Sequence, residues 1–422
     1  MNSAGTRPEI LIVNQHGENR GDEAAMRAMI EGLDRDLGGA RFTVVVQFQD
    51  TSLDLRFDED VTLLQMKMSY LHFLGLVVYA LLRRVGVSLR VLLAGEARRI
   101  IEAFETADLV LSAPGGPYFG DIYANHEIVH WFYIWLGRIY RRPMLLYAPS
   151  AGPFEIRWLN RVRRHLYRAF RVLCVREDIS RGHLHALLGE DTPVTVTADS
   201  ALQQTVAPKD RREYFVGQRA PLAQKYLVVV SAIQYRFPLA TDPAAAQSDY
   251  ESALLACLEH LNARKDCHFL LFPQLYGSAH SDVPFLESLR SRMPVGASSE
   301  IVSQDWDSNA QRQLIGMCDL CIASRYHPQI FAASATVPGI CIYYEHKARG
   351  FMEALGMQDF AFDIGDLHSA TLLQALDRCL QERDALLQRL REGIPPLRER
   401  SAETTRLAVA LLDPKPVEPG PN

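Results

Sequence analysis

The chain has 422 residues, of which 48% are hydrophobic and 23% are charged, and its formal net charge is −5. This length predicts two or three domains, and this composition is typical of a globular protein and excludes a disordered chain. The acidic balance excludes a general electrostatic attraction to nucleic acid or to an anionic membrane, so we expect no nucleic-acid partner.

The first residues, MNSAGTRPEI, contain no basic stretch followed by an apolar one. We therefore expect no secretory signal and a cytoplasmic location. The seven cysteines are widely spaced and lie mostly in apolar runs, which predicts reduced, buried thiols. Cys318 and Cys321 have the spacing of half a zinc site, but no second pair completes four ligands, so we predict no bound metal.

Short apolar runs alternate with amphipathic stretches through residues 1–212. Strands are predicted within EILIVNQ (residues 9–15), RFTVVVQF (41–48), ADLVLS (107–112), PMLLYAP (143–149), RVLCV (171–175) and TPVTVTA (192–198). The intervening segments predict helices, the first of them from residue 21. This alternation favours a parallel sheet with helices on both faces, which is a Rossmann-like domain.

An apolar helical insertion is expected at about residues 62–95. Its most apolar part, MSYLHFLGLVVYALLRR at residues 68–84, is too short to span a bilayer. It is either a core or interface helix, or a helix that lies on a membrane surface with Arg83 and Arg84 at the headgroups, which would give a peripheral contact at the inner face of the membrane.

The chain becomes polar at residues 207–224, and we place the domain boundary after residue 212. The pattern of strands and helices restarts at KYLVVVSAI and predicts a second Rossmann-like domain over residues 213–396. Residues 397–422 are expected to form a C-terminal helix and a Pro-rich tail. Two such domains in tandem leave a cleft between them, faced by the carboxyl ends of both sets of strands.

Two consecutive strand-to-helix junctions of the second domain carry candidate catalytic residues. Arg325 and His327 follow a strand that ends near Ser324, and we expect the next helix to begin near Pro328. Free backbone N–H groups at such a helix start attract an anion, and an imidazole placed there is expected to titrate near neutrality. Lys347 follows the next strand and, because neighbouring parallel strands end close together, should point to the same place. The alternative is that Arg325 and His327 only cap the sheet edge and the helix.

The first domain offers candidate binding residues across the cleft. Asn14, Gly21 and Asp22 lie in the loop after the first strand, and a second small-residue turn contains Gly115 and Gly116, where backbone can approach a ligand closely. Both segments can also be plain turns. Arg176 follows a strand and either crosses the cleft or pairs with Asp178. Neither Gly-rich segment has a dinucleotide or P-loop fingerprint.

Several of these motifs resemble the polysaccharide pyruvyl transferases. They are NQHGENRGDEAAM, LVLSAPGGPYFGD, VREDIS, LLFPQLYGSAHSD and SRYHPQIFAASATVPGICIYYEHKARGFMEALG, which together extend over most of residues 9–357. The resemblance implies two Rossmann-like domains arranged as in the GT-B glycosyltransferases. It also implies that His327 is the catalytic histidine, that Arg325 and Lys347 bind the donor, and that Arg176 and Gln274 contact substrate.

The implied reaction is the transfer of the pyruvyl group of phosphoenolpyruvate onto a sugar as a ketal. The expected partners are phosphoenolpyruvate as donor substrate, with no resident cofactor, and a glycan or lipid-linked sugar as acceptor. Two alternatives stay open, a GT-B glycosyltransferase that uses a nucleotide sugar and a non-catalytic relative that binds a glycan.

Overall fold

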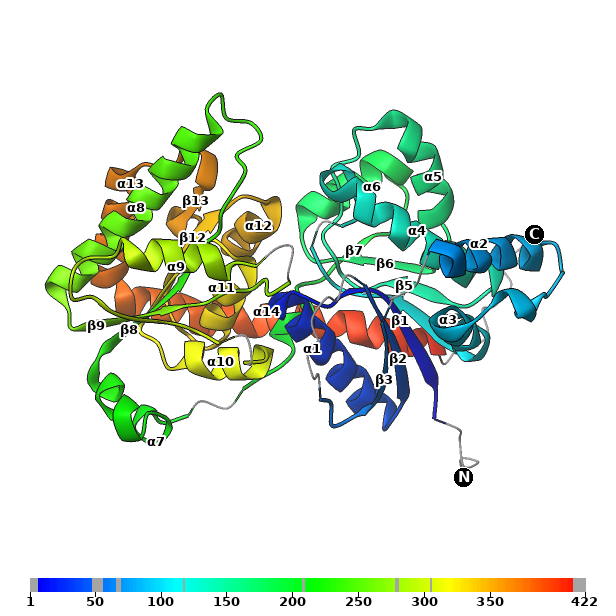
Figure 1. Ribbon diagram of the computed structural model, residues 1–422, viewed down its shortest axis with the longest axis horizontal. Helices are drawn as coiled ribbons and strands as arrows, with labels where there is room; N and C mark the ends of the chain where they lie inside the picture. The colour runs from blue at the N-terminus through cyan, green and yellow to red at the C-terminus, as the bar shows by residue number, and fades with distance from the viewer. Residues whose placement is uncertain are drawn as a thin grey trace.

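The computed structural model describes residues 7–47, 56–65, 70–116, 118–206, 209–277, 281–303 and 306–412 of the chain (Figure 1). Its described part forms two domains, each built around a parallel sheet, with strand orders β3-β2-β1-β4-β5-β6-β7 and β10-β9-β8-β11-β12-β13. The predicted pair of Rossmann-like α/β domains is therefore confirmed.

The first sheet contains the strands predicted from the apolar runs and one further strand. Its members are β1 (Glu9–His16), β2 (Arg41–Gln47), β3 (Asp60–Gln65), β4 (Leu109–Ser112), β5 (Met144–Leu146), β6 (Val172–Val175) and β7 (Thr195–Val196). Its helices are α1 (Arg20–Leu37), α2 (Tyr70–Arg84), α3 (Gly95–Thr106), α4 (Ala124–Ile139), α5 (Arg157–Tyr167) and α6 (Asp178–Leu188).

The expected helical insertion over residues 62–95 is partly wrong. Residues 62–65 belong to β3, which pairs in parallel with β2 as the edge strand of the sheet. Burial alternates over the first four residues of β3, with the two-residue period of a half-covered strand, before Leu64 is buried. The insertion proper consists of α2, a short 3-10 turn at Arg90–Leu92, and the start of α3.

The second sheet repeats the strand order of the first. Its strands are β8 (Tyr226–Ser231), β9 (Cys267–Leu271), β10 (Ser298–Ile301), β11 (Leu320–Ala323), β12 (Gly339–Tyr343) and β13 (Ala361–Asp363). Its helices are α7 (Arg211–Tyr214), α8 (Pro243–Arg264), α9 (Val283–Ser291), α10 (Ser308–Gly316), α11 (Tyr326–Ser334), α12 (His346–Ala354) and α13 (Ser369–Gln381). β9 and β11 are buried along their whole length, and β8 is buried at every residue after its first, as expected for a sheet covered on both faces.

Helix α14 (Arg383–Leu412) connects the two domains and begins well before residue 397. Figure 1 shows it crossing the molecule from the second domain to the first. Its first half contributes Leu386, Leu390 and Ile394 to the core of the second domain, and Ala408 near its other end packs into the core of the first. The helix is therefore shared between the domains.

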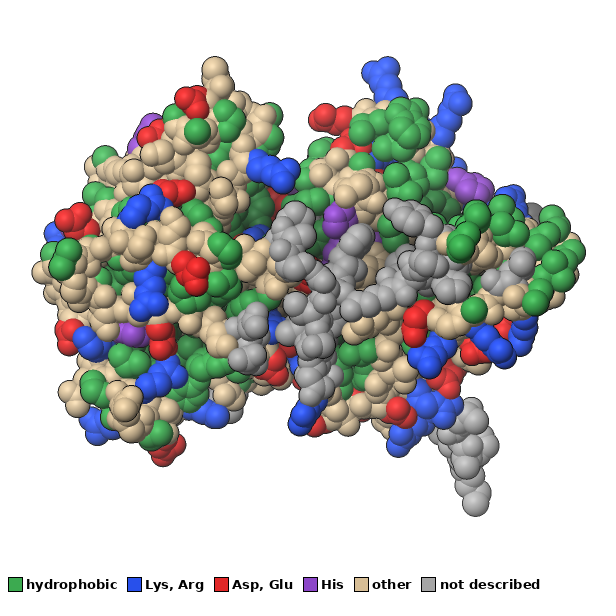
Figure 2. Space-filling model, in the orientation of Figure 1, with side chains coloured by type: hydrophobic (Ala, Val, Ile, Leu, Met, Phe, Trp, Pro, Cys, Tyr) green, Lys and Arg blue, Asp and Glu red, His purple; other side chains and the backbone are tan. Residues whose placement is uncertain are grey.

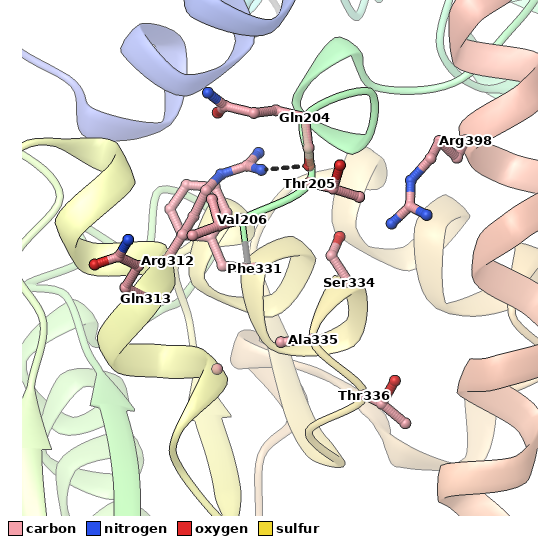
Figure 3. A pocket seen from close by; sticks show the side chains of 11 residues that line it. Gln204, Thr205, Val206, Arg312, Gln313, Phe331, Ser334, Ala335, Thr336 and Arg398 are labelled. Carbon is pink, nitrogen blue, oxygen red and sulfur yellow. Dashed lines mark hydrogen bonds between the residues drawn. The ribbon is translucent and has the colours of Figure 1, made fainter. Parts of the chain in front are cut away.

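The segment that leads from the first domain to the second is fixed by Arg312 of α10. Its guanidinium donates hydrogen bonds to the backbone carbonyls of Gln204, at 2.9 Å, and Ala201. Figure 3 shows Arg312 pointing to this segment, which borders a hollow of about 220 Å³ next to α11 and α14. The expected boundary region at 207–224 contains α7 and a 3-10 turn, while residues 207–208 lie outside the described part of the chain.

Backbone contacts join the domains directly. The N–H of Arg20 donates to the carbonyl of Gln274 at 3.0 Å, and the N–H of Tyr276 donates to the carbonyl of Glu18 at 3.3 Å. Asn19, which caps α1 by accepting from the N–H of Gly21, forms an antiparallel bridge with Leu275. The start of α1 is thus held against the second domain.

All seven cysteines are buried and unpaired, which confirms the predicted reduced thiols. Within the described residues no cluster of histidine, cysteine and acidic side chains is arranged to hold a metal ion. Among the same residues, no helix is both long enough and apolar enough to cross a membrane.

Candidate functional site

The candidate site lies where two neighbouring strands of the second sheet end. β11 and β12 pair in parallel, and each is followed after two residues by a helix, α11 and α12. α11 begins at Tyr326, two residues before the predicted start, so His327 lies in its first turn and Arg325 is its cap residue. Lys347 lies in the first turn of α12. The two helix starts therefore present His327 and Lys347 on the side that faces the first domain.

His327 is one of the points at which the second domain touches the first. It is only 5% exposed, and a Cβ atom added to Gly21 would lie 1.7 Å from its Nδ1. Gly21 was expected both in the loop after the first strand and at the start of the first helix, and it lies in the first turn of α1. The absence of a side chain at this position is what lets the imidazole rest against α1.

Asp199 and Arg176 form a buried ion pair beside the imidazole. Arg176 Nη1 is 2.6 Å from Asp199 Oδ2, and that oxygen is 3.8 Å from His327 Nε2. Arg176 also donates to Ser150 Oγ at 2.8 Å. Of the two alternatives left open for Arg176, pairing with Asp178 is wrong, because Asp178 pairs with Arg181.

Two cations lie close to the ring of Tyr326. The guanidinium carbon of Arg176 is 4.9 Å from the ring centroid, and Lys347 Nζ is 5.6 Å from it. Lys347 Nζ is also 2.7 Å from Glu345, which accepts a hydrogen bond from Tyr123 at 2.9 Å. Both cations are thus paired with carboxylates that an incoming anion could replace as partners.

Arg325 is directed to a different partner. Its guanidinium forms a two-point ion pair with Asp282 and donates to Tyr344 at 3.2 Å. Although burial opposes it, Asp282 and Tyr344 raise the pKa of Arg325, so this side chain stays charged. Asp282 also accepts from the backbone N–H of Gln274 at 3.0 Å. Arg325 thus braces the loop that contacts the first domain.

Asp22 of α1 faces the same cluster from the first domain. Burial raises the pKa of Asp22 to about 6, although Lys347 and Arg176 act in the opposite direction. The hydroxyl of Tyr118 donates to its carboxylate at 3.2 Å. At neutral pH this group therefore exchanges readily between its charged and neutral forms.

The remaining predicted residues contact the neighbours of the cationic cluster and not the cluster itself. Gly115 and Gly116 lie under the ring of Tyr118, where added Cβ atoms would be 3.4 and 3.2 Å from it. Asn14 has a positive φ of 64° and donates to Ser112 at 3.0 Å, which joins the ends of β1 and β4. The side chain of Gln274 donates to Gln311 at 2.7 Å.

The predicted near-neutral titration of His327 is wrong. Burial, which Asp199 opposes and to which Arg176 and Lys347 add, lowers the pKa of His327 to about 3. The sequence could not indicate this, because the burial comes from α1 on the other domain. In this structure the imidazole is neutral at physiological pH.

A cluster of aromatic rings next to Asp22 was not predicted. His16 stacks on Tyr118 with ring centroids 3.8 Å apart, and its Nε2 is 3.2 Å from Nε2 of His130. Burial, followed by His126, lowers the pKa of His130 to about 3. His126 and His130 lie one helical turn apart on α4, a spacing that was readable from the sequence.

Beside the ion pair of Arg176 and Asp199 lies a hollow of about 310 Å³ between the domains. Its lining includes Arg176 and Asp199 from the first domain and Tyr326 and Lys347 from the second. The lining carries three cations, Arg176, Lys347 and Arg400, and four carboxylates, Glu177, Asp178, Asp199 and Glu353. The part of the hollow where Arg176 and Lys347 meet the start of α12 is the part that suits a small anion.

Comparison with known proteins is consistent with this geometry. Residues 19–346 match the family described as polysaccharide pyruvyl transferase. The amylovoran biosynthesis protein AmsJ of Erwinia amylovora is 21% identical over 404 residues, which are 92% of this chain and 95% of AmsJ.

Two solved structures share the fold. HepE of Anabaena, crystallised in complex with UDP-glucose, has a TM-score of 0.59 at 18% identity, with 96% of this chain and 99% of HepE covered. MnaA of S. aureus, solved with UDP, has a TM-score of 0.60 at 12% identity, with 97% and 99% covered. The architecture is therefore the GT-B arrangement of two Rossmann-like domains. Within that class, the chain belongs to the polysaccharide pyruvyl transferase family and is a transferase of polysaccharide biosynthesis.

Proposed function

We propose that this protein transfers the pyruvyl group of phosphoenolpyruvate onto a sugar of a polysaccharide or glycolipid precursor and forms a ketal. The observation that carries the proposal is the interdomain hollow lined by Arg176 and Lys347 next to the buried His327. Family membership supports the same reaction class. The proposal includes no resident cofactor and no metal ion.

The cations of the hollow are assigned to the donor. Phosphoenolpyruvate carries a phosphate and a carboxylate a few bonds apart. Both groups need cationic partners when they move from water into a buried site. Arg176 offers a planar fork suited to either group, and Lys347 offers a compact charge. Arg325 is paired with Asp282, so it acts on the donor indirectly, by holding in place the loop that contains Gln274 and Asp282.

The proton steps are assigned to His327 and Asp22. Protonation of the vinyl carbon gives an oxocarbenium-like centre, which the oxygen of a sugar hydroxyl attacks while the hydroxyl proton passes to a base. The neutral imidazole of His327 has a free lone pair for that proton, and the negative charge of the bound donor would raise its pKa from about 3 and strengthen it as a base. A carboxyl with a pKa of about 6 suits the acid. Release of phosphate then regenerates an oxocarbenium-like centre, a second hydroxyl attacks it, and the departing phosphate takes the proton of that hydroxyl, which completes the ketal.

The direct test uses purified protein with phosphoenolpyruvate and a panel of nucleotide-linked and lipid-linked glycans, with phosphate release as readout. His327→Ala should lower turnover by about 10²-fold or more, because a positioned proton acceptor contributes at least that much. Near-normal turnover of the variant would remove His327 from the mechanism.

The competing glycosyltransferase function makes a different prediction. A nucleotide-sugar enzyme is stabilised against heat by UDP or GDP, because a ligand that binds only the folded state raises the melting temperature. The proposed function predicts stabilisation by phosphoenolpyruvate and none by these nucleotides. A non-catalytic relative would instead tolerate substitution at His327 and Lys347.

We assign the protein to the cytoplasm, where phosphoenolpyruvate and glycan precursors are made. The proposal keeps the peripheral membrane contact expected through residues 68–84, of which residues 68–69 lie outside the described part. It is supported by α2, which exposes apolar side chains to solvent.

A further inference from the structure

Helix α2 is apolar on two opposite faces, although only one of them is covered. Leu76, Tyr79 and Ala80 are fully buried against the first domain. A second stripe faces solvent, with each side chain between 38% and 79% exposed, and it consists of Leu71, Leu74, Val78, Leu81 and Val85. A surface helix of a globular domain normally presents polar residues on that face, so this stripe is an unpartnered apolar surface.

Each side chain of the stripe lies about one helical turn from the next. Its positions are separated by three or four residues, which places the four side chains within α2 along one line of the helix, with Val85 directly after its end. Figure 2 shows hydrophobic side chains gathered at this end of the first domain, where Figure 1 places α2. Val87, Leu89 and Val91 extend the exposed apolar surface beyond the helix.

A basic hollow adjoins the end of the stripe. It has a volume of about 910 Å³ and is bordered by the end of α2, the turn after it, and the ends of α3 and α4. One acidic side chain, Glu105, lines it together with six arginines, which are Arg83, Arg84, Arg90, Arg138, Arg141 and Arg142. This local excess of positive charge stands out on a chain whose net charge is −5.

Two of these arginines are available for a ligand. Arg90 pairs with Glu105 at 2.7 Å, and Arg138 contacts His165 at 2.7 Å. Within the part of the chain that the structure describes, Arg84 and Arg141 have no side-chain hydrogen bond or ion pair. The hollow therefore keeps two guanidinium groups that none of the described residues binds.

We propose that the arginine hollow binds the phosphate headgroups of an anionic membrane surface while the α2 stripe inserts among the lipid chains. An interfacial helix combines an apolar face with adjacent Lys and Arg side chains in this way, and anionic lipids attract such clusters. A guanidinium fork matches a phosphate oxygen pair. The site lies outside the interdomain cleft and would hold the enzyme at the surface that carries lipid-linked glycans.

Charge argues against a second copy of the chain as the occupant. A symmetric dimer would place the same patch on both subunits face to face. The excess of arginine charge on each copy would then repel the other, whereas a bilayer with anionic headgroups neutralises it. A lipid surface fits both the apolar stripe and the basic hollow.

The inference rests on the proposed membrane contact of residues 68–84. Co-sedimentation with vesicles distinguishes a failure of the headgroup site from a failure of that membrane contact. Vesicles of phosphatidylcholine alone are compared with vesicles that also contain phosphatidylglycerol. The double variant Arg84→Gln and Arg141→Asn removes two charges, and asparagine tolerates the positive φ of 53° at position 141. Arg391→Gln, at an exposed arginine of α14, is the matched control.

The double variant should bind phosphatidylglycerol vesicles about 30-fold more weakly, since each basic side chain near an anionic surface strengthens binding about fivefold. Binding to pure phosphatidylcholine should stay as in the unmodified protein. The variant Leu74→Ser and Leu81→Ser should bind both kinds of vesicle more weakly, with Leu239→Ser, at a fully exposed position of the second domain, as its control.

Unchanged binding of the arginine variant to anionic vesicles would overturn the headgroup site while leaving a membrane contact through α2. No binding of the unmodified protein to either vesicle would overturn both. A dimer in analytical ultracentrifugation that Leu74→Ser and Leu81→Ser dissociates would assign the stripe to a second copy instead. Phosphate release with a water-soluble acceptor should be normal in all these variants, so the proposed reaction is judged separately.

Discussion

At the scale of single residues, the contact between Gly21 and His327 is the most demanding feature of the site. A Cβ at position 21 would overlap the imidazole, whereas a Cβ at Gly182 on α6 would meet nothing within 4 Å. We expect Gly21→Ala to displace the imidazole and lower turnover by about 10²-fold, as a misplacement of about 1 Å can do. Gly182→Ala should leave turnover unchanged and add up to about 1 kcal/mol of stability. Equal turnover in the two variants would contradict the contact.

Asp22 gives a prediction of pH dependence. Its pKa of about 6 in the folded protein, against 3.8 when exposed, means that the folded state binds this proton more tightly, so its ionisation destabilises the fold as pH rises. Asp22→Asn cannot ionise and keeps an oxygen that accepts from Tyr118. Its stability advantage over the unmodified protein should grow between pH 4 and pH 7 towards about 3 kcal/mol. Melting temperatures measured across this range test it, and a pH-independent difference would contradict it.

The sequence could predict His327 and Lys347 but not their environment. Each follows an apolar run and lies at a helix start. Because neighbouring parallel strands end close together, the two side chains are expected at the same edge of the sheet. Asp199 follows a predicted strand in the same way and could have been found by the same reasoning. The burial that neutralises His327 could not, since it comes from Gly21, more than 300 positions away in the chain. Arg325 was expected at the donor, but its partner Asp282 lies in a loop whose path no local pattern reveals.

At the scale of elements, α14 is the part whose role the sequence concealed. Its helical pattern was readable, but nothing local indicates that its end returns to the first domain. Likewise β3 is a short, half-buried edge strand, and its residues 62–65 were assigned to the helical insertion because an apolar segment follows them. Long apolar strands such as β8 were predictable because both of their faces are buried.

Coupling of the domains through α14 can be tested at Ala408. This residue is fully buried in the core of the first domain, while Ala410 on the same helix is exposed. Ala408→Glu should cost about 3 kcal/mol or more, because it leaves an unpaired charge in an apolar core. Calorimetry should show the first domain melting earlier and apart from the second. Ala410→Glu should melt as the unmodified protein does, and a single unshifted transition for Ala408→Glu would refute this role of α14.

At the scale of the whole molecule, the site exists only in the arrangement of domains seen here. Asp22, Asp199 and Arg176 come from the first domain, and His327, Lys347 and Tyr326 come from the second. The backbone contacts of Arg20 with Gln274 and of Glu18 with Tyr276 hold these two sets in register. An enzyme built in this way can exclude water from a reactive donor only when both halves are in place.

The most direct test of this account is a calorimetric titration of the purified protein with phosphoenolpyruvate. We predict saturable binding at one site, weakened at least about tenfold in Lys347→Met, because a charge-assisted hydrogen bond contributes about 1.5–3 kcal/mol. UDP-glucose should neither bind nor compete. Absence of phosphoenolpyruvate binding, or displacement of it by UDP-glucose, would contradict the assignment of the interdomain hollow to a pyruvyl donor.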